Sequence, residues 1–232
     1  MGWNPTIYLI KRLNSGTYKS FRASMPDSIR RTDNPSRLEF VEQNTETDSI
    51  GCFKFPFHYF RANVEETGSE AVQIDSYEVP EGAMLVLNAA SSPRFYYPQD
   101  EITERETTEK TEGLKACAEA VVRAACVDVA LSFVSYIKGG ENIRDTITML
   151  PVSNFSLVRE GLEPKLDGNL ATLTQDGNGQ IEAVTQNGYH RFCVGRFPFG
   201  TNESTSTSKE AGLSQIFARN MAAALGLLRV HS

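Results

Sequence analysis

Short strand-like segments separated by turn residues recur along this chain, and a long amphipathic pattern interrupts them. Asn14-Ser15-Gly16 lies between the first two segments, which are therefore predicted to form a hairpin. Pro80-Glu81-Gly82 is predicted to turn the chain before the sixth. The six strands expected in this first part cover residues 6–10, 18–22, 38–43, 52–61, 71–77 and 83–87.

The apolar spacing then changes to steps of three and four residues, which is typical of an amphipathic helix. We expect this helix to end at Gly139-Gly140. The acidic, threonine-rich residues 99–112 before it are predicted to form a solvated connector. The apolar stripe consists of Leu114, Cys117, Ala118, Val121, Val122, Ala125, Val129 and Phe133.

Strands are expected again after the helix, and a second helix closes the chain. Asn187-Gly188 is a strong hairpin signal between two of these strands. Thr207 and Glu210 form a capping box for the last helix. We expect Leu114, Val121, Phe217 and Met221 on the two helices to be buried, in the core or against a second copy. The expected strands cover residues 146–152, 155–159, 171–174, 181–186 and 189–197.

This element order predicts an α+β protein with antiparallel β-sheets and two amphipathic helices. The predicted halves are residues 1–140 and 141–232, each with strands followed by a helix. A tandem duplication is one interpretation, because residues 38–44 and 181–187 share four identities in seven and each precedes a Phe-Pro-Phe sequence. Alternatives are a single fused pseudo-twofold domain and a chance match.

Composition and charge narrow the class of protein. The four cysteines show no CxxC spacing, which favours free thiols over a disulfide framework. No basic-then-apolar leader opens the chain, and the apolar residues 116–137 carry three charges. We therefore expect a soluble protein of the virion or the cytoplasm, without membrane partners or signal-peptide export. The net charge of −6 argues against coating nucleic acid by charge alone.

No catalytic, phosphate-binding or metal-binding motif is present in the sequence, and no cofactor is expected. Cys52, His58, His190 and Cys193 would form a zinc site or a cysteine–histidine pair if the two repeats faced each other. The competing interpretation is that a cysteine within an apolar strand is a small buried hydrophobe. The sequence therefore predicts neither a metal site nor catalytic residues.

Two segments, residues 53–61 and 191–197, interleave aromatic rings with cations. On a sheet face this pattern is typical of single-stranded nucleic-acid binding, in which bases stack on rings and cations contact phosphates. The predicted contacts are Lys54, Arg61, Arg191 and Arg196. Strand alternation offers another interpretation, in which Phe53, Phe55, Phe57 and Tyr59 pack in the core while Lys54, His58 and Phe60 point the other way.

The element order over each half resembles that of the coat proteins of single-stranded RNA phages. The resemblance implies an N-terminal hairpin, dimerisation through sheet and helices, and an RNA hairpin bound on the inner face of the sheet. This chain departs from that family in its acidity and in its smaller number of strands in the second half.

Three functions follow from these patterns. The first is a non-enzymatic assembly protein, a viral or phage coat subunit that self-associates and contacts single-stranded RNA. The second is a cytosolic single-stranded nucleic-acid-binding protein. The third is an enzyme whose site is built from distant residues, for which a pocket with His58 or His190 beside a carboxylate would be the sign.

Overall fold

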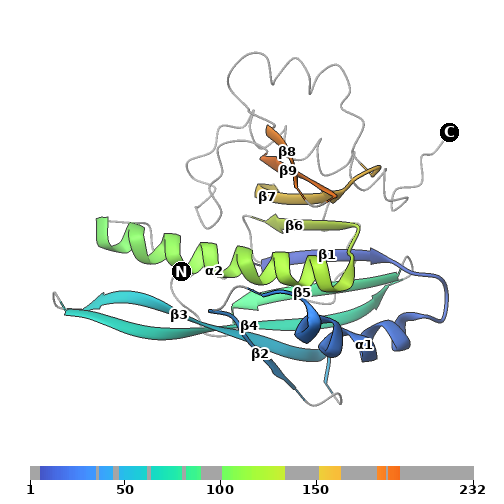
Figure 1. Cartoon of the computed structure of the whole chain (residues 1–232), viewed down its shortest axis with the longest axis horizontal. Coiled ribbons are helices and arrows are strands. Elements are labelled where there is room, and N and C mark those ends of the chain that lie inside the picture. Colours follow the sequence, from blue (N-terminus) through green and yellow to red (C-terminus); the bar gives the residue numbers. More distant parts are fainter. Residues whose placement is uncertain are drawn as a thin grey trace. The chain divides into compact units, whose positions relative to one another are not determined.

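The computed structural model describes residues 6–34, 37–43, 47–61, 64–79, 82–89, 101–133, 152–162, 182–186 and 188–193. It divides into two compact units, Met1–Val127 and Asp128–Ser232 (Figure 1). Both are built on antiparallel strands, and two helices are described, so the predicted α+β class with antiparallel sheet is confirmed. No helix in the described part of the chain is long and apolar enough to cross a membrane.

The first unit contains an antiparallel sheet with the strand order β2-β3-β4-β5-β1. β1, β2, β3 and β5 confirm predicted strands, and β4 includes the predicted residues 71–77 but begins earlier, at Val64. The strands are β1 (Thr6–Arg12), β2 (Glu39–Glu42), β3 (Ser49–Arg61), β4 (Val64–Val79) and β5 (Gly82–Ala89).

Helix α1 (Tyr18–Arg31) replaces the second strand of the predicted N-terminal hairpin, so that prediction is wrong. Met25 and Ile29, one turn apart, are both buried and explain the helical period. Gly16, at a φ of 79°, lies in the turn after β1 as expected, but this turn leads into α1 and not into a strand. The five residues used for the prediction are too few to separate a period of 2 from one of 3.6.

Helix α2 (Glu101–Ala125) corrects two further predictions. Residues 101–112 form the first half of this helix and not a connector. Their acidic side chains near the helix N-terminus are favoured by the helix macrodipole, which explains a helix there without an apolar stripe. The helix also ends earlier than expected, at Cys126, whose φ of 46° is left-handed. Lys11 Nζ donates a 2.6 Å hydrogen bond to the Cys126 carbonyl at this end.

The apolar stripe is therefore divided between two elements. Leu114 and Val121 are 2% and 0% exposed, which confirms their predicted burial. Val129 and Phe133 lie in a strand instead of on the helix, because the left-handed residue turns the chain before them. Phe217 and Met221, with the whole predicted last helix, lie outside the described residues.

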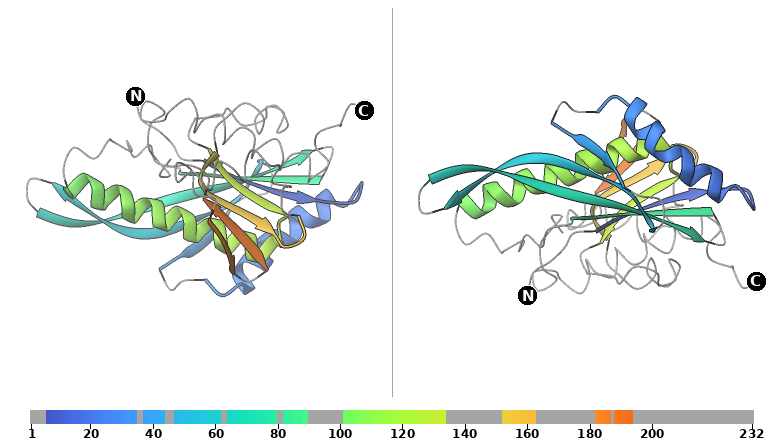
Figure 2. Two further views of the ribbon diagram at one scale, coloured as in Figure 1. Left: turned by 90° about the horizontal axis from the view of Figure 1, so that it is seen from above. Right: turned by 90° about the horizontal axis from the view of Figure 1, so that it is seen from below.

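Both helices of the first unit lie on one face of its sheet, which we call the helix face (Figure 2). Phe53, Val72 and Leu85 occupy this face on three adjacent strands and are each fully buried. Tyr18 of α1 bonds to Ser76 on the same face, with 3.0 Å between Oη and Oγ. The core of the unit therefore lies between this face and the helices.

The second unit contains β6 (Val129–Phe133), β7 (Val152–Arg159), β8 (Glu182–Gln186) and β9 (Tyr189–Cys193). Their antiparallel order is β6-β7-β9-β8. Gln186 pairs with Tyr189, so the predicted two-residue hairpin around Gly188 is confirmed. Residues 146–151 and 171–174 lie outside the described residues.

The two copies of the suggested repeat lie in β2 and β8, each paired with a cysteine-containing strand. The registers differ, however. Cys52 faces Val41 in the first pair, whereas Cys193 faces Glu182 in the second. Matching positions of the two copies thus have different partners, and the duplication stays a proposal.

Candidate functional site

Strands β3 and β4 extend well past their other neighbours. β2 pairs with β3 only up to Lys54, and β5 pairs with β4 only from Val72 onwards. Among the described strands, residues 55–61 and 64–70 therefore pair only with each other, and we call this two-stranded segment the arm. Figures 1 and 2 show it continuing beyond the other strands of the first unit, with α2 beside it.

Three contacts attach the arm to α2. The ring of Phe55 lies directly against the backbone at Gly113, where even a Cβ atom would be 2.8 Å from Cδ2 and closer to Cε2 and Cζ. Lys110 Nζ lies 4.4 Å from the ring centroid of Phe57, a cation–π contact. The backbone N–H of His58 donates a 2.8 Å hydrogen bond to Glu109 Oε2. The arm thus has a hydrophobic support on the helix face.

The aromatic residues of β3 are part of that support. Phe53 is fully buried and Phe55 is 2% exposed, while Lys54 and His58 between and beyond them are exposed. The predicted burial is therefore confirmed for Phe53 and Phe55, whereas Phe57 is half-buried and the side chain of Tyr59 lies outside the described residues. Phe53 and Phe55 are not available for stacking on bases.

The outer edge of β3 in the arm is protected. Because the His58 N–H binds Glu109, it points away from β4, and N–H directions alternate along a strand. Residue 56 therefore faces the same edge, and it is a proline with no N–H. One donor is absent and the next is occupied, which hinders pairing along this edge at residues 56–58.

The outer edge of β4 in the arm has no such protection within the described part of the chain. The register places Ser69 opposite Pro56, Thr67 opposite His58 and Glu65 opposite Phe60. Their backbone N–H groups therefore point away from β3. No described strand pairs with residues 64–71 on that side. We call this side of residues 64–71 the β4 edge.

Lys54 is the predicted nucleic-acid contact whose surroundings the structure describes. It lies on the face opposite the helix face, in a groove of about 380 Å³ that Arg37 also lines. Glu39 pairs with it across β2 and β3. The groove residues are Arg37, Leu38, Glu39, Lys54, Phe55, Pro56 and Ser69.

The other predicted contacts are only partly placed. Arg61 is the last residue of β3, and Arg191 lies in β9 opposite Leu157 and Val184. The side chains of both, and Arg196 as a whole, lie outside the described residues.

A second cleft of about 380 Å³ lies between α1 and the ends of β2, β3 and β4. Arg22 donates a hydrogen bond to the carbonyl of Thr47, but its Nε is buried without a described acceptor. The lining residues of the cleft are Tyr18, Lys19, Arg22, Ala23, Pro26, Glu42, Ile50 and Glu78.

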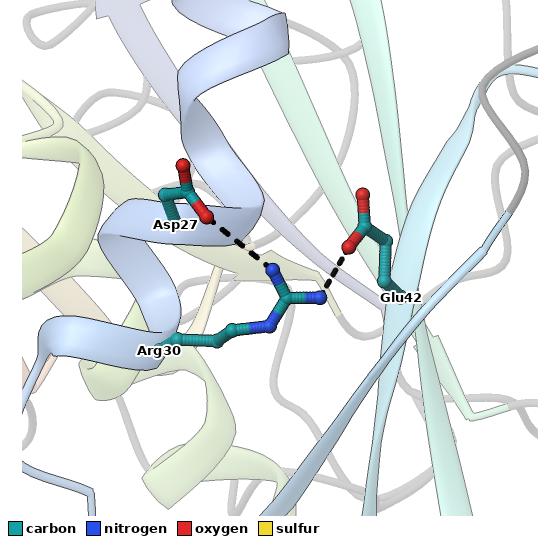
Figure 3. Close-up of polar contacts among 3 residues, drawn as sticks. All are labelled: Asp27, Arg30 and Glu42. Atoms are coloured by element: carbon teal, nitrogen blue, oxygen red, sulfur yellow. Dashed lines mark hydrogen bonds and ion pairs between the residues drawn. The ribbon is translucent and has the colours of Figure 1, made fainter.

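Arg30 fixes α1 to the sheet beside this cleft (Figure 3). Its guanidinium bonds to Glu42 of β2 and lies 3.4 Å from Asp27, one turn earlier on the helix. It also stacks over Phe40 at 5.8 Å from the ring centroid. The hydrogen bond to Glu42 raises the pKa of Arg30.

The cysteine–histidine site is not assembled in the described residues, which contain no group of three or more potential metal ligands. Cys52 and His58 share a face of β3 but lie six residues, or about 20 Å, apart. Cys117 is fully buried, and burial raises the pKa of its thiol well above the usual range. The side chains of His190 and Cys193 lie outside the described residues.

Comparison of the sequence with protein-family models gives no match, and comparison with curated proteins gives none either.

Proposed function

We propose that this chain is a non-enzymatic structural subunit that assembles with further copies of itself, as a coat or shell protein does. The β4 edge carries the proposal. A two-stranded ribbon is only marginally stable in water, and long strand edges invite pairing with another chain. In this arm the β3 edge is hindered from pairing, whereas the β4 edge is open to pairing with another strand.

Because the β3 edge is protected and the β4 edge is not, the open β4 edge is more consistent with a function than with chance. The β3 edge has two of the protections that natural sheets use, a proline and a helix side chain bound to the outward N–H. The same helix also supports the arm from the helix face, so the arm is held ready for a partner. The proposal does not depend on the phage coat resemblance, because α1 replaces the N-terminal hairpin which that resemblance implies.

The test removes one donor from the β4 edge. In Thr67→Pro the outward N–H is lost while the β3–β4 hydrogen bonds remain, so the mass measured by light scattering should fall toward that of a monomer. Thr67→Val keeps the N–H and the branched shape of the side chain, and it should assemble like the native protein. Equal masses for all three proteins would contradict the proposal.

Hydrogen exchange on the native protein makes the test independent of how the proline variant folds. If the β4 edge is paired between copies, the amides of Thr67 and Ser69 exchange slowly at high protein concentration and faster on dilution. Fast exchange of both amides at every concentration would also refute pairing at this edge.

The groove formed by Arg37 and Lys54 supports a second candidate function, contact with single-stranded RNA on the face opposite the helices. Both residues line the same concave surface and both are cations. Replacing both with alanine should weaken RNA binding and reduce its salt dependence by about two phosphate contacts. Arg31→Ala, an exposed cation of α1 outside the groove, is the matched control. An unchanged salt dependence in the double variant would exclude this contact.

A further inference from the structure

We infer that the β4 edge pairs antiparallel with the β4 edge of a second copy, about a twofold axis that passes beside Thr67. This inference rests on the proposed function and names the contact and its register. The partner is a second copy of this chain, because each copy carries the same edge and two identical edges can pair antiparallel about a twofold axis.

The direction of the N–H groups limits the possible registers. Antiparallel hydrogen-bonded pairs join residues whose N–H groups both point across the new interface. On the β4 edge these are the odd-numbered residues, including Glu65, Thr67 and Ser69. Only registers that pair odd residues with odd residues are therefore allowed.

The neighbouring strand β5 limits the register further. It occupies this side of β4 from Val72 onwards, where Val72 pairs with Ala89. A partner strand can therefore reach only as far as Ala71. With Thr67 on the axis, Val64 of one copy faces Glu70 of the other, and the arm of each copy ends just before the partner's β5.

Charge selects among the remaining registers. With the axis beside Thr67, Glu66 of each copy faces Gly68 of the other, so no carboxylate lies directly opposite another. An axis beside Gly68 would place Glu66 opposite Glu70, and one beside Glu66 would place it opposite itself; like charges in such positions are destabilising. Gly68 also permits the close approach of a second backbone.

The inferred interface pairs Thr67 with Thr67 and Glu65 with Ser69 of the second copy. Facing threonines are a favourable cross-strand pair. The two sheets of the first units would become continuous through their arms. The groove lined by Lys54 lies on a sheet face, and Ser69 at its border would lie beside the partner strand.

A single cysteine at the axis tests the register. Thr67→Cys, in a background in which Cys126 and Cys193 are replaced by serine, brings two thiols onto facing residues with Cα atoms about 5.5 Å apart, within disulfide range. Mild oxidation should then give a covalent dimer. Ser69→Cys on the same strand is the control; its two copies would lie about 14 Å apart along the strands and should stay uncrosslinked.

The outcomes separate this inference from the proposed function. Crosslinking of Thr67→Cys alone supports the register. Crosslinking of Ser69→Cys in its place, or of neither variant in a protein that light scattering shows to be oligomeric, overturns the register and leaves self-assembly standing. A monomeric mass for the native protein overturns both.

Discussion

Gly113 is the position at which a single added methyl group tests the attachment of the arm most sharply. Its Cβ would lie 2.8 Å from Phe55 Cδ2 and nearer to two further ring atoms, whereas ordinary carbon contacts are about 3.5–4.0 Å. Phe55 is 2% exposed, so its ring lies within the core. Gly113→Ala therefore forces either the ring or the helix to move.

Two opposing effects set the size of the change. Overpacking of a core costs about 1–3 kcal/mol, and replacing glycine by alanine within a helix returns about 1 kcal/mol. The approach of 2.8 Å and less puts the overpacking cost in the upper part of that range, at about 2–3 kcal/mol, so Gly113→Ala should lower the free energy of unfolding by about 1–2 kcal/mol. The assay is urea denaturation followed by circular dichroism, which reports the helix and sheet of the first unit.

A second background isolates the cause. In Phe55→Leu the ring atoms that meet the new methyl group are absent, so Gly113→Ala should cost little there or become stabilising through helix propensity. A Gly113→Ala protein as stable as the native one would refute the close contact between arm and helix. An equal cost in both backgrounds would also refute it.

Three further predictions concern other parts of the described structure. Iodoacetamide should label exposed Cys126 quickly and buried Cys117 only on unfolding, as mapped by peptide mass spectrometry; early labelling of Cys117 would contradict the core packing. Arg159→Gln removes the guanidinium that lies 2.7 Å from the buried Asp128 carboxylate, so it should destabilise the second unit by about 1–2 kcal/mol in thermal or urea unfolding; an unchanged stability would show that the pair is unimportant. Burial, followed by nearby carboxylates, raises the pKa of Tyr77, so the stability linked to its neutral form is present below about pH 10 and is lost as the pH rises through the folded pKa. Tyr77→Phe should therefore lose less stability in alkali than the native protein, and an equal loss in both proteins would refute this.

The strands of the first unit could be predicted because each has its own local signal. β3 alternates buried rings with exposed polar residues, and β5 is a short apolar run that begins at a glycine. The hairpin of β8 and β9 follows from Asn187-Gly188 alone. These features depend only on residues close together in the sequence, so they can be read from the sequence itself.

The two helices show where local signals fail. The start of α1 alternates like a strand, and only its later residues Met25 and Ile29 reveal the helical period. The first half of α2 has no apolar stripe, since it lies along the arm instead of across the sheet core. In both cases the conformation is decided by tertiary contacts, and a short sequence window contains no information about those contacts.

The candidate site was also hidden from the sequence. Residues 65–70 are polar apart from Gly68, so they do not resemble a strand, yet residues 64–70 pair with the whole outer half of β3. The useful signal was the length of β3, because a strand of 13 residues needs a partner of similar length. The protection of one edge by Pro56 and Glu109 becomes visible only once the register is known.

The mass of the native protein in solution, measured by light scattering over a range of concentrations, tests the central claim most directly. Self-assembly through the arm predicts a mass of at least twice the 25.7 kDa of one chain, and a shell predicts a mass many times larger. A mass of one chain at every concentration would contradict the account.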